Sequence, residues 1–163
     1  MNLLLSALSE LPEYRALEQA VESGQVAAMA GVGQLARSHL IASLFRDTGR
    51  PALVICQDDM AVQRMQQELA AFLDQAPEIL PGREFTFYDA AVVSRGWEQK
   101  RLRQLYDLAT GRTRLLIASL DALSLRTMPK PVLFSAAVTL KCGASYEMEA
   151  LAQRLTDAGY ART

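Results

Sequence analysis

The 163-residue sequence has few residues of the kinds that hold metals or cross-link chains, with one histidine and two cysteines. A single histidine, His39, cannot supply a cluster of ligands, and no cysteine–histidine spacing typical of zinc sites is present. Cys56 and Cys142 lie far apart, each in or beside an apolar run. We therefore predict free, buried thiols in a cytoplasmic protein, with no metal site and no disulfide.

The sequence also lacks an excess of positive charge and a long apolar run. Its 17 lysines and arginines against 18 aspartates and glutamates give a formal net charge of −1, so no global basic field attracts nucleic acid. No apolar run approaches the roughly 18 residues that cross a bilayer. The first residues, MNLLLSALSELPEY, lack the basic region of a signal peptide. These absences predict a cytoplasmic protein that has no membrane partner.

What is present is an alternation of short apolar runs with amphipathic stretches, in a composition that is 50% hydrophobic and 21% charged. Continuous runs such as ALVIC and LLIAS are typical of strands buried on both faces. We expect strands at 26–30, 52–56, 79–80, 115–119 and 136–140, and helices at 3–20 (interrupted near Pro12), 38–45, 62–73 and 97–109. Gly49 and Pro51 are expected to stop the helix that contains residues 38–45. This alternation predicts an α/β fold with an open, mostly parallel sheet flanked by helices.

The stretch AGVGQLARSHL, residues 30–40, occupies the expected place of a phosphate-binding loop. It follows the predicted strand 26–30 and precedes a helix whose N-terminus would attract phosphate. Against the pattern G-x-x-x-x-G-K-[ST], Gly31 matches the first glycine and Ser38 matches the magnesium-binding hydroxyl. The two positions between them that carry the chemistry do not match.

Ala36 replaces the second glycine, and its Cβ obstructs the backbone from wrapping around phosphates. Arg37 replaces the lysine and is too large and planar to fit the same cradle equivalently. No Asp-Glu pair that could bind the metal and activate water follows a later strand. Asp58 does follow a strand, but it is expected to cap the next helix. We interpret the loop as degenerate and inactive, with no cofactor bound. Two alternatives stay open: a weak nucleotide or half site, and a tight strand-to-helix turn made by Gly31 and Gly33.

Other candidate residues have plainer interpretations. Trp97 is expected to pack within the protein rather than to contact a partner. An aromatic segment, Phe85 to Asp89, is expected to anchor the core and end in a turn. A local basic cluster is predicted to form a solvated helix face with intramolecular ion pairs, and the alternative is contact with a phosphate or an acidic partner. The cluster consists of Arg95, Lys100, Arg101 and Arg103.

Four segments in order resemble a known family. Residues 30–73 resemble the first lobe of the excision-repair helicase UvrB and of its relative, the transcription-repair coupling factor (Mfd), in the loop, the GRP-x-LV entry to a strand and the L-x-x-F end of a helix. FTFYDAAVVSRGWEQKRLRQLYDLATG, RLLIASLDALSLRTMPKP and LKCGASYEMEALAQRLTDAGYART resemble the family's next three segments. The resemblance covers roughly residues 20 to 163.

Two departures separate the relatives. UvrB has an intact phosphate loop, and it carries a long tyrosine-rich hairpin after its aromatic-Asp segment. Here seven residues, Ala90 to Gly96, separate Asp89 from Trp97, and none of them is aromatic, so nothing there could stack on bases. The chain therefore resembles the N-terminal, UvrB-like part of the coupling factor, a degenerate helicase lobe related to RecA.

This resemblance implies the function of a whole protein. The coupling factor displaces RNA polymerase stalled at a lesion, using ATP and magnesium on double-stranded DNA, and recruits UvrA for nucleotide excision repair. The N-terminal module supplies UvrA contact and autoinhibition, so this chain is expected to have no catalytic residue and no enzyme activity. The expected domains are a leading helical segment (1–20), the UvrB-like lobe (21–138) and the start of the UvrA-binding domain (139–163).

The C-terminal stretch LAQRLTDAGYART predicts a helix closed at Gly159. Leu151, Ala152 and Leu155 share one face, and such a stripe needs a partner. We expect the second domain to be truncated after its first strand and helix. We expect this helix to be mobile, exchanged with the same helix of another chain, or packed against a second copy. Self-association is therefore a predicted property. Residues that contact UvrA are not assigned.

Overall fold

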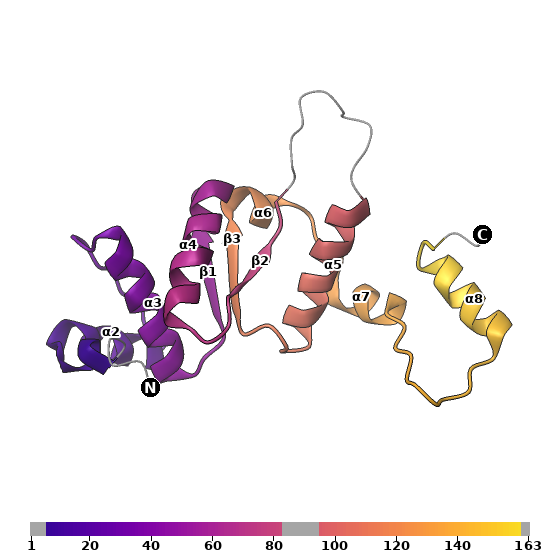
Figure 1. Ribbon diagram of the computed structural model, residues 1–163, viewed down its shortest axis with the longest axis horizontal. Coiled ribbons are helices and arrows are strands. Elements are labelled where there is room, and N and C mark those ends of the chain that lie inside the picture. The colour runs from indigo at the N-terminus through magenta and orange to yellow at the C-terminus, as the bar shows by residue number, and fades with distance from the viewer. Residues whose placement is uncertain (1–5, 83–94, 161–163) are drawn as a thin grey trace, which may run out of the picture. The chain divides into compact units, whose positions relative to one another are not determined.

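The computed structural model describes residues 6–82 and 95–160 (Figure 1). Its contacts divide the chain into two compact units, 1–125 and 126–163. The elements of the first unit are η1 (Leu8–Glu10), α2 (Pro12–Glu22), α3 (Gln34–Thr48), β1 (Ala52–Cys56), α4 (Asp59–Phe72), β2 (Glu78–Leu80), α5 (Arg95–Ala109), β3 (Leu115–Ser119) and α6 (Leu120–Ser124). Those of the second unit are α7 (Lys130–Ala136) and α8 (Met148–Asp157). The domain boundaries expected from the sequence stay predictions.

The first unit is built on a three-stranded sheet in the order β1-β3-β2. Both pairings are parallel, and the register places Val54 and Ile79 on either side of Ile117. Parallel neighbours require crossovers, which the helices between the strands provide. The predicted α/β fold with an open parallel sheet is therefore confirmed.

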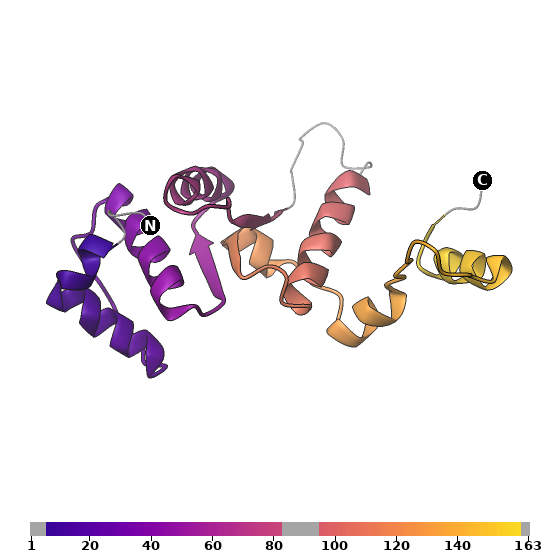
Figure 2. The same ribbon diagram turned by 60° about the horizontal axis from the view of Figure 1, so that its bottom comes forward.

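Helices cover the two faces of the sheet unequally (Figure 2). On one face, Ala42 of α3 and Val62 and Leu69 of α4 form a buried cluster with β1 and β3. On the other face, Ala122 of α6 and the half-buried Leu105 of α5 pack against β2 and β3. On this face the helices α5 and α6 thus cover β2 and β3, and no residue of β1 belongs to the second cluster.

The strand β1 is not buried on both faces, contrary to the sequence prediction. Ala52, Val54 and Cys56 face the helices α3 and α4, whereas Leu53 is 49% exposed and Ile55 is 55% exposed. All five residues of β3, by contrast, are buried. A continuous apolar run therefore indicated burial correctly for the central strand but not for the strand at the sheet edge.

Two predicted strands are absent from the described residues, and both corrections have a physical reason. Residues 26–30 form no strand, and Val26 is fully exposed. Three of those five residues are alanines, which favour strands weakly and bury little apolar area. Residues 136–140 form no strand either. Ala136 is the last residue of α7, whose first turn contains Pro131, a residue that favours a helix start, and residues 137–140 lie in no helix or strand.

Local signals set the ends of several helices, and the sequence predicted those at Gly49 and Asp58. Gly49 adopts a left-handed conformation at φ 58° and ends α3, a backbone shape that favours glycine. The Asp58 carboxylate accepts a hydrogen bond of 2.8 Å from the backbone N–H of Ala61 and caps α4. The Ser119 hydroxyl accepts a hydrogen bond of 3.1 Å from the N–H of Ala122 and caps α6. Each cap satisfies a backbone donor at a helix start.

A buried tyrosine ties the leading helix to α3. Tyr14 of α2 is 1% exposed, and its hydroxyl donates a 2.6 Å hydrogen bond to Asp47. Burial, together with this hydrogen bond, raises the pKa of the Tyr14 phenol. Burial alone would raise the pKa of Asp47 as well, but hydrogen bonds from Arg46 and Tyr14 outweigh it and hold that pKa below its usual value. The predicted leading helix is thus anchored by a polar contact inside the first unit.

The second unit contains little buried surface in its described part. Glu147 caps α8 by accepting hydrogen bonds from the N–H groups of Glu149 and Ala150, and Leu151 and Leu155 are half-buried. The expected helix of this region is present, whereas the strand expected before it is not. Self-association through α8 stays a prediction.

The cysteine prediction is confirmed in one respect and wrong in another. Both cysteines are free, and Cys56 is buried whereas Cys142 is exposed. Burial raises the pKa of the Cys56 thiol. Within residues 6–82 and 95–160, no group of three or more histidine, cysteine, aspartate or glutamate side chains is placed to hold a metal. No helix in the same residues is long and apolar enough to cross a membrane.

Candidate functional site

The candidate phosphate loop is mostly helix. Gly31 has a positive φ of 75°, and Gly33 is the extended residue immediately before α3. The helix begins at Gln34, so Ala36, Arg37 and Ser38 all lie within its first turn and a half. Because residues 26–30 form no strand, the loop does not follow a strand of the described sheet, and the predicted placement at a strand end is wrong.

Ser38, the residue that matches the magnesium-binding hydroxyl, is fully buried. Its hydroxyl donates a hydrogen bond to one carboxylate oxygen of Glu68 on α4. The side-chain amide of Gln34 donates a 2.9 Å hydrogen bond to the other oxygen of Glu68. Both oxygens of one carboxylate thus hold the first turns of α3 against α4. We call these three residues the α3–α4 lock.

Arg37, which stands where the lysine would be, turns back onto its own loop. Its Nε donates a 3.0 Å hydrogen bond to the carbonyl oxygen of Val32. The side chain is otherwise on the surface. Gly33 and Arg37 line one groove, whereas Gly31 and Ala36 do not line it and Ser38 is buried against Glu68. The five candidate residues therefore do not converge on one centre.

A groove of about 620 Å³ lies next to the α3–α4 lock, at the carboxyl end of β1. This is the region where open α/β sheets bind ligands. Its lining is mainly apolar, with Leu40 and Ile41 of α3 and Val54 and Ile55 of β1. Its polar lining residues include Gln34, Gln57, Glu68 and the two arginines Arg37 and Arg64.

The prediction that the basic cluster forms a single solvated face is wrong. Arg101 is only 5% exposed, and its guanidinium donates hydrogen bonds of 2.8 Å to the carbonyl oxygen of Pro81 and of 2.9 Å to that of Ala122. It also lies 5.9 Å from the ring centre of Trp97, within cation–π range. Burial lowers the pKa of Arg101. Arg101 is thus a structural connection between α5, α6 and the end of β2.

The other members of the cluster differ from Arg101. Lys100 and Arg103 are exposed as predicted. Trp97 is half-buried, and its ring N–H donates to the carbonyl oxygen of Gly82, which agrees with the predicted packing role. The side chain of Arg95 and the aromatic segment Phe85 to Asp89 lie outside the described residues.

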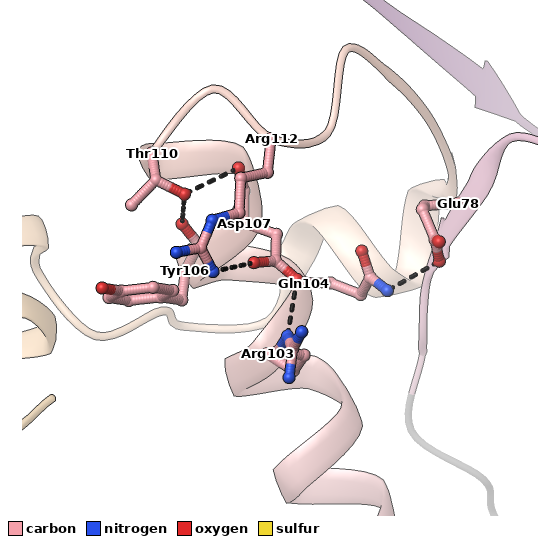
Figure 3. A network of polar contacts seen from close by, with 7 residues as sticks. All are labelled: Glu78, Arg103, Gln104, Tyr106, Asp107, Thr110 and Arg112. Atoms are coloured by element: carbon pink, nitrogen blue, oxygen red, sulfur yellow. Dashed lines mark hydrogen bonds and ion pairs between the residues drawn. The ribbon is translucent and has the colours of Figure 1, made fainter. Parts of the chain in front are cut away.

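Polar contacts at the end of α5 serve the fold (Figure 3). Asp107 accepts from Arg103 at 2.7 Å and from Arg112 at 3.3 Å, so it connects α5 to the turn that leads into β3. Gln104 donates a 2.7 Å hydrogen bond to Glu78 of β2. Because these acidic and basic groups satisfy each other, the network is suited to holding α5 against the sheet.

Glu68 was not singled out from the sequence, and Arg101 was named but assigned a solvated face instead of its buried position. Glu68 is separated from Ser38 by 30 positions, and no local pattern pairs them. Arg101 did carry a signal, because it lies four residues after Trp97 and four before Leu105. Residues at that spacing share one face of a helix, and Trp97 and Leu105 mark that face as the packed one.

Comparison with known proteins gives distant similarity to one family. The chain is 24% identical over 165 residues to a transcription-repair-coupling factor of Bacillus subtilis, covering all of this chain and 14% of that protein. It is 28% identical over 148 residues to a transcription-repair-coupling factor of Myxococcus xanthus, covering 86% of this chain and 12% of that protein. No family model and no solved structure matches. The chain thus spans about one seventh or less of these relatives.

Proposed function

We propose that this chain is the non-catalytic, UvrB-like N-terminal module of a transcription-repair coupling factor. The sequence similarity to two such factors supports the family. The α3–α4 lock carries the non-catalytic part of the proposal, because it places the Glu68 carboxylate on the hydroxyl that would bind magnesium. In the whole protein, a motor elsewhere in the chain uses ATP and magnesium to displace stalled RNA polymerase along DNA, and UvrA is recruited in the cytoplasm.

Two physical arguments support an inactive loop. First, a phosphate cradle needs backbone N–H groups that surround the ligand, and here the helix already extends through Ala36 and Arg37. Second, the hydroxyl of Ser38 and the side-chain amide of Gln34 are both already bonded to the Glu68 carboxylate, so neither group is available to a nucleotide at this turn. Within this proposal, the module contributes surfaces for partners and for autoinhibition and contributes nothing to ATP turnover.

A chimaeric coupling factor tests this role. In the Bacillus subtilis protein, the segment aligned with this chain is replaced by this chain, and Arg37→Ala/Ser38→Ala is introduced. We expect ATP turnover to stay within about twofold of the unsubstituted chimaera, because the loop takes no part in catalysis. The positive control replaces the phosphate-loop lysine of the motor in the same chimaera, which should abolish turnover. A tenfold or larger fall caused by the Arg37/Ser38 pair would contradict the proposal.

A further inference from the structure

The groove beside the α3–α4 lock runs along an open sheet edge. Its lining includes the consecutive residues Val54, Ile55 and Cys56 of β1. Because consecutive side chains of a strand point to opposite faces, a groove that reaches all three follows the edge of the strand. In the described part of the chain, β1 pairs with β3 alone, so its other edge offers backbone N–H and C=O groups.

The edge is apolar rather than protected. Ile55 is 55% exposed and Leu53 is 49% exposed, and β1 contains no proline or charged residue. Proteins that keep an edge strand free usually blunt it with lysine, proline or a bulge. The walls of the groove add Leu40 and Ile41 of α3. The site therefore offers both backbone pairing and apolar contact to an incoming segment.

The charges of the groove favour an acidic partner. Both oxygens of Glu68 are engaged by Gln34 and Ser38. Arg37 uses its Nε on the carbonyl oxygen of Val32, and the side chain of Arg64 makes no hydrogen bond or ion pair with any other described residue. Two guanidinium groups thus line an apolar groove in which the one carboxylate is already bonded.

We propose that this groove binds an extended, apolar polypeptide segment that carries carboxylates, and that the segment adds to β1 as a further strand. Strand addition supplies backbone hydrogen bonds, and neighbouring pockets supply specificity. Apolar side chains pack on Leu40, Ile41 and Val54, while a carboxylate pairs with the forked donors of Arg37 and Arg64. The inference concerns a protein partner and does not rest on the proposed function.

A peptide titration on the 163-residue chain tests the groove. The probe is a fluorescent, amidated peptide in which valine alternates with threonine and the last two residues are glutamate; the control peptide ends in two lysines. Fluorescence anisotropy should show the acidic peptide binding about tenfold or more tightly than the lysine peptide, because the groove charges are complementary. Raising the salt concentration should narrow that difference, since ion pairs are screened.

Matched variants locate the binding. Arg37→Ala/Arg64→Ala should weaken the acidic peptide about tenfold or more, whereas Arg126→Ala/Arg154→Ala removes the same charge from the exposed surface of the second unit and should change binding less than about twofold. Ile55→Glu should also weaken binding, because it places a like charge on the edge. Circular dichroism checks that each variant keeps its fold.

Three results would overturn this inference. The first is no binding of the acidic peptide up to about 1 mM. The second is an equal loss of affinity for the acidic peptide in both double arginine variants, because that would mean that only the net charge of the protein attracts the peptide. The third is evidence that something else occupies the groove. This would be displacement of the acidic peptide by saturating inorganic pyrophosphate, or self-association of the chain that depends on Arg37 and Arg64. None of these bears on ATP turnover in the chimaera, so the two proposals fail separately.

Discussion

Replacing Arg101 by methionine is expected to lower the free energy of unfolding by about 2–3 kcal/mol, since hydrogen bonds to a charged group contribute roughly 1.5–3 kcal/mol each and the removed desolvation cost offsets part of the loss. Methionine keeps the length of the side chain but leaves the carbonyl oxygens of Pro81 and Ala122 without this donor. The contact with Trp97 is lost as well. Urea denaturation followed by circular dichroism measures the change.

The control for Arg101 is Arg103, two residues along the same helix. Its side chain is 71% exposed and pairs with Asp107, so Arg103→Ala should destabilise the protein much less than Arg101→Met, because exposed ion pairs contribute little. If Arg101→Met and Arg103→Ala destabilise equally, Arg101 is not the connection between α5, α6 and β2 that the contacts indicate. Both substitutions remove one positive charge, so net charge cannot explain a difference between them.

Ile117→Ala should destabilise the protein by about 3–4 kcal/mol, whereas Ile55→Ala should cost less than about 1 kcal/mol. Ile117 lies in the central strand with no exposed surface, while Ile55 lies in the edge strand and is 55% exposed. The first substitution therefore leaves a cavity in the core and the second does not. Thermal or urea unfolding of the two variants measures both costs in one experiment.

The two isoleucine variants also test the sequence-based expectation that β1 and β3 are both buried on two faces. Similar losses of about 3 kcal/mol for both variants would show that β1 is covered in the isolated chain. The difference between the two variants isolates the effect of burial, because both remove the same atoms from the same type of residue.

The parts of the fold that follow from local pattern were predictable. Strands 52–56 and 115–119 were predicted at their observed bounds, and Gly49 and Asp58 were predicted to bound the helices around β1. These positions depend on turn chemistry, capping and apolar runs, which the neighbouring residues settle. Local pattern could not predict how far β1 is buried on its second face. That burial depends on α5 and α6, which pack over the opposite edge of the sheet.

The candidate site depended on long-range contacts, and there the sequence was less informative. The helix was predicted to begin at Ser38, but it begins at Gln34. Gln34, Leu35, Ala36 and Arg37 are all good helix formers, so without the second glycine nothing local stops the helix earlier. The partner that stabilises this start is Glu68, on a different helix. The loss of the cradle at Ala36 stays a prediction, and the contact of Glu68 with this turn was not foreseen from the sequence.

A titration of the chain with fluorescent ATP and magnesium tests most directly whether the loop is closed to nucleotides. Ser38→Ala is the companion variant, because it removes the hydroxyl that would hold magnesium. We expect no saturable binding up to about 1 mM nucleotide for either protein. Binding in the micromolar range by the natural chain, abolished by Ser38→Ala, would contradict this expectation and would show that the α3–α4 lock opens to admit phosphate.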